Sequence, residues 1–427
     1  MEITCTQLAR RVELICVRTD KFKTGVFSVT LAVPLKAETA TANALVGDVL
    51  YRGSRKHPDI ESISLATDEL YGASLGPSVR QRGESQCIGF SASFLDDRYA
   101  LDGTAVLEPV LELMGELLLD PLTENGIFRE DFVRGEGANL ADQIRARVND
   151  KRSWSIFRLT QEMCAGEPYA LDKLGNADEA ENMTAGHLWE QYQTLLREAR
   201  VIFYYGGAAP AQRVETAVKS SFAPLITHRD TRLSCSVTAA PEGEVRRVID
   251  EMDVSQGKLA LGFRTGGITA QHPDYPALLV CNALYGGTPN SKLFLNVRER
   301  LSLCYYASSV MDKLKGIMVV SSGVEFEKFS VAENEILAQL DAVRRGDMSE
   351  SELTAAKRAV VASFQTCLDS QGRLEDHWTT QAISGGALEG PDRFVESVEQ
   401  VSAEDVMRVA GQIQLDTVYR LSGKEGV

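Results

Sequence analysis

Ser291-Lys-Leu-Phe-Leu-Asn-Val-Arg-Glu-Arg-Leu-Ser-Leu-Cys-Tyr305 is the stretch of this sequence that says most about the fold. It begins as an apolar helical run, carries Arg298, and breaks near Ser302 before it reaches Tyr305. A spacing of seven residues returns to nearly the same face of an ideal helix, but the break predicts that Tyr305 lies just beyond the helix end. We expect both side chains to point into one cleft. There an Arg can donate to peptide carbonyls and a Tyr hydroxyl can donate to an oxyanion.

The residues around this pair resemble the second-domain signature of the pitrilysin, insulinase and mitochondrial processing peptidase family of zinc proteases. Gly286-Gly-Thr, Ser291-x-Leu-Phe, Val-Arg-Glu and Leu-Cys-Tyr follow one another in the order and spacing of that family. In the family, the Arg and the Tyr hold and polarise a peptide opposite a zinc ion that the other domain binds. The resemblance therefore implies that Arg298 and Tyr305 act on a substrate. An arbitrary Arg and Tyr would more simply be a surface cation and a core aromatic.

The zinc-binding half of such a site is missing from the sequence. A zinc peptidase needs two His on one helical face, a third ligand and a carboxylate base, whereas the five His residues of this chain lie far apart, at positions 57, 187, 228, 272 and 377. The segment 49–54 resembles the family stretch that follows the His-x-x-Glu-His motif, which puts Ala44, Gly47 and Asp48 at the three motif positions. The best match for the third zinc ligand is Gln143, and Gln is a poor zinc ligand. We expect no metal site in this chain.

The two halves of the sequence resemble each other. Near the end of each half, a helix with Thr184 or Ser402 at its N-cap leads to a strand that closes on Gly206 or Gly423. Alternating apolar patterns such as 88–94 and 259–263 mix with long helices, which is typical of an α+β layer fold. Together with the family resemblance, this predicts two homologous α+β domains of the processing-peptidase (LuxS/metallohydrolase-like) type. Each is expected to be a mostly antiparallel sheet packed with helices, at residues 1–228 and 241–427.

Composition argues against several classes of function. The net charge of −15 is unfavourable for binding nucleic acid or anionic membranes. The sequence has no stretch of roughly 18 consecutive apolar residues, the length of a membrane helix, and its first residues lack the apolar run of a signal peptide. The eight Cys form no Cys-x-x-Cys pair and are expected to be buried, reduced thiols. We therefore expect a cytoplasmic protein.

The leading hypothesis is that this chain is the non-zinc subunit of a two-chain peptidase and is inactive alone. A homologous partner would carry zinc in an intact His-x-x-Glu-His motif, and this chain would supply Arg298, Tyr305 and half of a chamber around the peptide. The chain would form a heterodimer with that partner or a homodimer with itself. The alternative is a non-catalytic peptide-binding or scaffold protein of the same fold, like the core subunits of respiratory complexes. An independent hydrolase is disfavoured, because no Gly-x-Ser-x-Gly elbow or phosphate-binding loop is present.

Overall fold

The computed structural model describes residues 1–385 and 390–423, which fold into two compact units. Unit 1 comprises Met1–Arg145, Leu171–Ser234 and Ser370–Ala387, and unit 2 comprises Ala146–Ala170, Cys235–Asp369 and Leu388–Val427. Each unit is a set of residues that contact one another, and each contains segments from both halves of the sequence. The boundaries of these units differ from those of the two domains expected from the sequence, 1–228 and 241–427. Those two domains stay a prediction.

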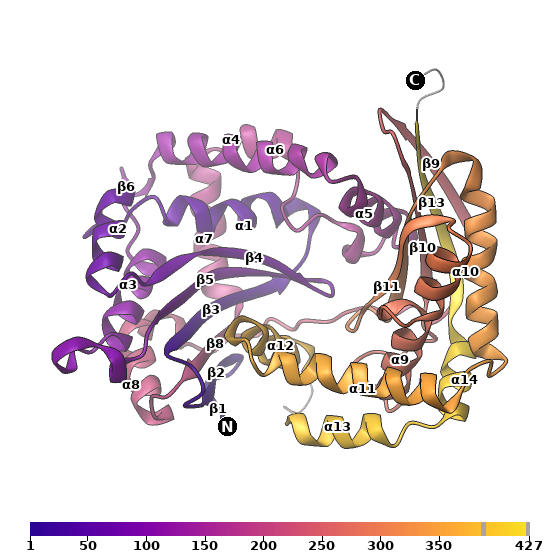
Figure 1. Ribbon diagram of the computed structural model, residues 1–427. Coiled ribbons are helices and arrows are strands. Elements are labelled where there is room, and N and C mark those ends of the chain that lie inside the picture. Colours follow the sequence, from indigo (N-terminus) through magenta and orange to yellow (C-terminus); the bar gives the residue numbers. More distant parts are fainter. Residues whose placement is uncertain (386–389, 424–427) are drawn as a thin grey trace. The chain divides into compact units, whose positions relative to one another are not determined.

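Unit 1 is built on a six-stranded sheet with the strand order β1-β2-β8-β3-β5-β4 (Figure 1). All neighbouring strands are antiparallel except β2 and β8, which are parallel. The strands are β1 (Glu2–Ala9), β2 (Val12–Arg18), β3 (Thr24–Pro34), β4 (Ser74–Arg82), β5 (Ser85–Leu95) and β8 (Arg200–Gly207). Four helices share one apolar core with this sheet: α1 (Ala37–Leu50), α3 (Leu107–Leu119), α7 (Ala185–Glu198) and α8 (Ala211–Ser221).

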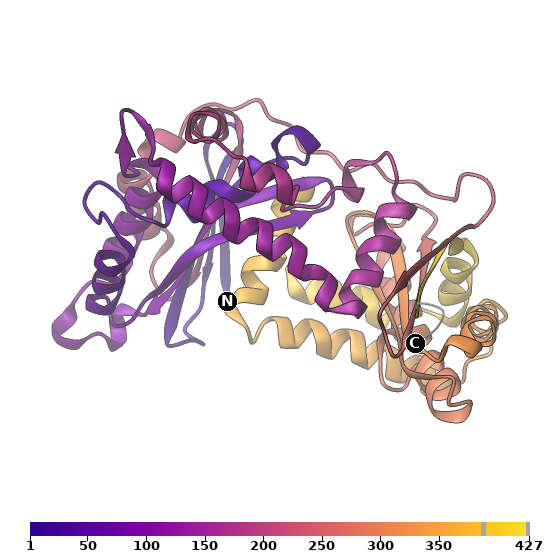
Figure 2. The ribbon, with the colours of Figure 1, turned by 90° about the horizontal axis from the view of Figure 1, so that it is seen from above.

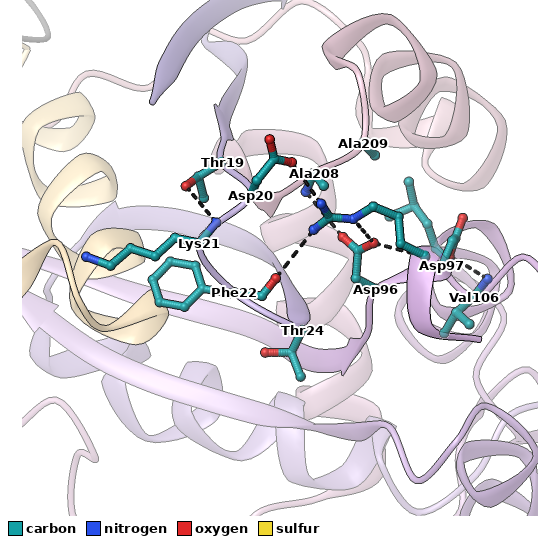
Figure 3. Close-up of polar contacts among 12 residues, drawn as sticks. Thr19, Asp20, Lys21, Phe22, Thr24, Asp96, Asp97, Val106, Ala208 and Ala209 are labelled. Atoms are coloured by element: carbon teal, nitrogen blue, oxygen red, sulfur yellow. Dashed lines mark hydrogen bonds and ion pairs between the residues drawn. The ribbon is translucent and has the colours of Figure 1, made fainter.

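The remaining elements of unit 1 add further residues to the same core or connect its parts. They are α2 (Ile60–Glu69), the hairpin β6 (Thr123–Glu124) and β7 (Ile127–Phe128), α4 (Glu130–Ala146), α6 (Ala177–Glu181), and the 3-10 turns η1 (Asp97–Tyr99), η2 (Leu101–Gly103) and η5 (Ala223–Leu225). Loops at one end of the sheet are joined by Asp96, whose carboxylate accepts hydrogen bonds from Arg98 and, at 3.3 Å, from the Ala208 N–H (Figure 3). The neighbouring Asp97 accepts from the Val106 N–H at 2.9 Å. These bonds fix the ends of β5 and β8 relative to each other.

Unit 2 repeats the same strand arrangement. Its five-stranded sheet has the order β11-β12-β10-β13-β9, in which only β13 and β9 are parallel. The strands are β9 (Arg246–Met252), β10 (Gly257–Arg264), β11 (Cys304–Asp312), β12 (Ile317–Val324) and β13 (Gln414–Gly423). Read from the other edge, this order corresponds strand by strand to β2-β8-β3-β5-β4 of unit 1. The predicted repeat, and the prediction of mostly antiparallel sheets packed with helices, are confirmed.

Two helices of unit 2, α11 (Glu350–Cys367) and α14 (Ala403–Gln412), begin at side-chain caps. Ser349 and Ser402 each form a capping box with the residue three positions later, as Thr184 caps α7 in unit 1. The helices are α9 (Tyr275–Asn282), α10 (Phe329–Arg344), α11 (Glu350–Cys367), α13 (Pro391–Glu399) and α14 (Ala403–Gln412), with the short turns η3 (Arg147–Asn149), η4 (Pro168–Ala170) and η8 (Phe326–Lys328). In the part of the chain that the structure describes, no helix has the length and apolar character needed to span a membrane.

Each unit receives one helix from the other half of the sequence. In unit 2, Leu159 of α5 (Lys151–Met163) packs with Ala260 and Tyr419 on the sheet. In unit 1, Glu375 of α12 (Gln371–Ser384) accepts hydrogen bonds from Ser28 at 3.0 Å and from Arg80 at 2.6 Å. Since side chains alternate along a strand, Ser28 points away from the core that its neighbours Phe27 and Val29 share with α1. Helix α12 therefore covers the opposite face, and Figure 2 shows this late helix beside the indigo strands of unit 1.

Candidate functional site

Arg298 lies on an unusual helix of unit 2. The signature segment folds into two π-helical stretches, η6 (Ala283–Gly287) and η7 (Leu293–Arg300). Buried Leu293 and Val297 pack η7 onto the core, and the Arg298 side chain lies on the outer side with 41% of its surface exposed. π-Helical segments are rare and occur frequently at functional sites. The sequence predicted a helix here but not its wider form.

The Arg298 guanidinium is held by weak contacts. Its Cζ lies 4.6 Å from the centroid of the Phe294 ring, and its Nε lies 3.6 Å from Oε1 of the exposed Glu299. Exposed contacts of these kinds contribute about 1 kcal/mol or less each. A guanidinium has five N–H donors in a fixed fork. Most of these donors therefore remain available to a ligand.

The break before Tyr305 is confirmed. Helix η7 ends at Arg300, Ser302 adopts a left-handed conformation with φ 47°, and β11 begins at Cys304. A positive φ is uncommon for a residue other than Gly. Tyr305 follows at the start of the strand, and 67% of its surface is exposed.

Arg298 and Tyr305 lie at the same end of unit 2. Burial raises the pKa of the Cys304 thiol, and the nearby Arg298 guanidinium acts in the opposite direction. Helix η7, which carries Arg298, also packs against β11, whose second residue is Tyr305. The structure brings the two residues to one edge of the sheet, because β11 is its outermost strand. Their action on a substrate stays a prediction.

Zinc, which the family resemblance implies, does not fit the residues of α1. Ala44 is 1% exposed and lies within the core of unit 1, where it offers no donor atom. A Cβ added at Gly47 would lie 3.0 Å from the Pro77 Cβ of β4, closer than ordinary contact. A Glu at position 47 would therefore collide with β4. The close approach of α1 and β4 thus leaves little room for the family's catalytic carboxylate at this position.

Glu136 of α4 is the residue that faces the third motif position. Burial and the Glu136 charge raise the pKa of Asp48 to about 6. Glu136 also accepts hydrogen bonds from Arg52 at 3.2 Å and Asn139 at 2.9 Å. Gln143, the sequence match for the third zinc ligand, is exposed further along α4. The match of Gln143 to the third zinc ligand stays a prediction. Throughout 1–385 and 390–423, no three His, Cys, Asp or Glu side chains are grouped to hold a metal ion.

Ser54, His57 and Glu116 form a cluster with the residue types of a hydrolase triad. The three side chains are not connected in the order of a triad. Nδ1 of His57 lies 2.9 Å from Oε1 of Glu116, and the buried Ser54 hydroxyl donates to the same carboxylate oxygen. In a catalytic triad the His lies between the Ser and the acid, so that it can take the Ser proton. Here the acid lies between them. The cluster joins the loop after α1 to α3 and has the geometry of a structural contact.

Sequence reasoning missed Arg152. Its guanidinium lies 4.3 Å from the centroid of the Tyr306 ring, and its Nη2 donates to the Ser308 hydroxyl at 3.0 Å. Arg152 is on α5, more than 150 positions before Ser308, and it carries no motif. No signal in a single sequence connects it to the Arg298 and Tyr305 segment.

Known proteins resemble this chain over nearly its full length. The model of the "Peptidase M16 inactive domain" matches residues 182–360, which include Arg298 and Tyr305. "Probable inactive metalloprotease YmfF" of Bacillus subtilis (strain 168) is 36% identical over 410 residues, covering 96% of this chain and 95% of that protein. A conserved protein from Enterococcus faecalis V583 has a similar fold, with a TM-score of 0.91 and 24% identity over 100% of both chains. A peptidase M16 inactive domain from Pseudomonas fluorescens has a TM-score of 0.82 and 17% identity over 99% of each chain. The chain therefore belongs to the M16 metallopeptidase family.

Proposed function

We propose that this chain is the non-zinc subunit of a two-chain peptidase, and that it supplies Arg298 and Tyr305 to a homologous partner that holds zinc. The observation that carries the proposal is the contrast between two helices. In α1, the motif positions Ala44 and Gly47 are packed against their surroundings. In η7 and the turn after it, an unusual helix and the left-handed Ser302 support two exposed polar side chains. Strained backbone of this kind clusters at functional sites.

Each of the two residues has a defined part in this proposal. The zinc ion of the partner would supply the nucleophile for peptide hydrolysis. Arg298 binds carbonyl oxygens of the peptide with its fork of N–H donors. Tyr305 donates a hydrogen bond to the scissile carbonyl oxygen as negative charge develops on it. Both groups act by hydrogen bonding from the side opposite the metal, which is why they can belong to a different chain.

The proposal includes a peptide as substrate, a homologous zinc-motif chain as partner, and a cytoplasmic location. No disulfide joins the eight Cys, all of which lie in the described part of the chain, and Cys16, Cys87, Cys164 and Cys281 are buried. A reducing compartment keeps such thiols unpaired. A homodimer of this chain would lack zinc on both sides, so the heterodimer is the form for which hydrolysis is proposed.

The test is reconstitution with a homologous chain from the same genome that carries an intact His-x-x-Glu-His motif. Hydrolysis of fluorogenic peptides and bound zinc are measured for each chain alone and for the mixture. We expect activity in the mixture only, and zinc on the partner only. Y305F should lower kcat by roughly 10²–10³-fold, the range found when one oxyanion donor is removed, and R298A should raise KM.

Two control variants keep the comparison specific. R300A removes a more exposed Arg of the same helix, and Y99F removes the hydroxyl of an exposed Tyr in unit 1. Both should leave the activity of the mixture unchanged. The proposal fails if R298A and Y305F behave like these controls in an active mixture.

A non-catalytic peptide-binding or scaffold role is the second candidate. The closed contact between Gly47 and Pro77 favours it, as does the description of the Bacillus relative as inactive. In this case the chain would bind a peptide or a partner chain without raising the rate of hydrolysis. Titration calorimetry with the same peptides and the same partner separates the two candidates, because only binding would then be observed.

A further inference from the structure

The strand that carries Tyr305 contains a β-bulge. Cys304 pairs with Val324 and Ala307 pairs with Ser322, so that Tyr305 and Tyr306 together stand opposite the single residue Gly323. In a regular strand, side chains three positions apart would lie on opposite faces. Here Ala307 is buried in the core of unit 2 and Cys304 packs against the same core. The extra residue changes the direction of the side chains just before the regular strand begins.

The ring of Tyr306 is confined by Gly323 on the neighbouring strand. A Cβ at Gly323 would lie 2.8 Å from Cε1 of Tyr306, a separation that real Cβ atoms essentially never show. The absence of a side chain at this position thus makes room for the ring beside β12. The bulge and the Gly opposite it form one structural feature.

Arg152 contacts the bulge from α5. Its guanidinium Cζ lies 4.3 Å from the Tyr306 ring centroid, and its Nη2 donates to Ser308 at 3.0 Å. Tyr306 and Ser308 are two positions apart and lie on the same face of β11. The Asp150 carboxylate caps α5 by accepting from the Arg152 N–H at 3.0 Å, which fixes the backbone from which this side chain extends. Arg152 therefore bridges the bulge and the regular part of the strand.

The contact depends on the Tyr306 ring and not on its hydroxyl. The hydroxyl oxygen is buried and has no hydrogen-bond partner among the described residues. A phenyl ring would keep both the stacking on Arg152 and the fit beside Gly323. A Phe at position 306 should therefore preserve these contacts, whereas an Ala should lose them.

We propose that Arg152 and Tyr306 are positioning residues for Tyr305: the guanidinium holds the Tyr306 ring in the bulge, and the bulge directs the Tyr305 hydroxyl outward from the sheet edge. This inference rests on the proposed function, since it gives Tyr305 a substrate to act on. It explains why a helix from the first half of the sequence reaches the signature of the second half. Misplacing a reacting group by about 1 Å can cost 10²-fold in rate, so R152A should lower kcat by roughly tenfold to a hundredfold.

The first arm of the test needs only this chain. The chain is labelled with 3-fluorotyrosine, and the ¹⁹F signals of Tyr305 and Tyr306 are assigned from Y305F and Y306F. We expect R152A and Y306A to shift or broaden the Tyr305 signal, and Y306F to leave it in place. R147A is the matched control, because the Arg147 guanidinium also lies 4.3 Å from an aromatic centroid, that of Phe157. An unchanged Tyr305 signal in R152A overturns the inference.

The second arm uses the reconstituted mixture with the zinc-motif chain. We expect kcat to fall in R152A and Y306A with little change in KM, and Y306F to retain wild-type kcat. S308A, which removes only the hydrogen-bond acceptor, should have a smaller effect in the same direction. A wild-type mixture without hydrolysis would refute the proposed function, while the ¹⁹F arm would still decide whether Arg152 positions Tyr305. Wild-type kcat in R152A would show that the positioning has no catalytic role.

Discussion

The contact between Gly47 of α1 and Pro77 of β4 yields the sharpest prediction about the lost metal site. An added Cβ at position 47 would lie 3.0 Å from the Pro77 Cβ, where ordinary contact begins at 3.4 Å. G47A should therefore strain the helix against the strand. P77G removes the opposing Cβ, so G47A should be tolerated in that background. A double-mutant cycle of G47A and P77G measures this coupling directly.

The expected magnitudes follow from two opposing effects. Replacing Gly by Ala inside a helix stabilises it by about 1 kcal/mol. Overpacking a well-packed contact costs about 1–3 kcal/mol. G47A alone should thus lower the free energy of unfolding by about 0–2 kcal/mol. In the P77G background, G47A should raise the free energy of unfolding by about 1 kcal/mol. The coupling energy is then about 1–3 kcal/mol.

Urea unfolding of the four proteins, followed by circular dichroism, measures the cycle. G135A is the matched control, because Gly135 lies on α4 and a Cβ added there would meet no atom within 4 Å. G135A should stabilise the wild-type and P77G chains equally. If G47A does the same, the Gly47 and Pro77 contact is not tight. The structural reason for excluding a Glu at position 47 would then be wrong.

Three further predictions concern stability. E375A should lower the free energy of unfolding of unit 1 by about 3–5 kcal/mol. Glu375 is 3% exposed, and its loss leaves Arg80 and the buried Arg82 without this partner. A loss below about 1 kcal/mol in urea unfolding would contradict this prediction. The pKa of Asp48 is raised from 3.8 in the unfolded chain to about 6 in the folded chain. As the pH rises from about 4 to about 6, the unfolded chain therefore releases this proton before the folded chain does, and the wild type loses stability. D48N should abolish that loss and be more stable than the wild type at pH 7 by at least about 1 kcal/mol, with equal pH profiles of Tm as the refuting result. S302G should stabilise unit 2 by about 0.5–1 kcal/mol and S302V should destabilise it by more than about 1 kcal/mol, since φ is 47° at this position; similar Tm values for both variants would rule this out.

Features that depend on neighbouring residues could be predicted from the sequence. The N-caps Thr184 and Ser402 are confirmed, because a capping side chain bonds within three residues of itself. The break near Ser302 is confirmed for the same reason, since it separates a helical period from a strand period. The strands at 259–263 and 418–423 also lie within β10 and β13. In these segments local preference and fold agree.

Features that depend on distant contacts could not be predicted. The stacking of Arg152 on Tyr306 and the bond from Ser28 to Glu375 join residues from different halves of the sequence. The π-helical form of η7 has no periodic signature in eight residues. Gln143 was matched by motif spacing, whereas the approach of Glu136 to α1 follows from how the helices pack.

The two units share one strand arrangement but differ in how their signature segments are built. In unit 1, Ala44 is buried in the core and a Cβ added at Gly47 would lie 3.0 Å from the Pro77 Cβ of β4, so α1 packs closely on its surroundings at these two motif positions. In unit 2, the left-handed Ser302 and the bulge at Tyr305 persist although an ordinary turn and a regular strand would be less strained. Most random changes destabilise, and selection removes only those that fall below the stability needed for function. Strain in unit 2 that is matched by named supporting contacts, from Arg152 and Gly323, is therefore an argument for the proposed binding role of this segment.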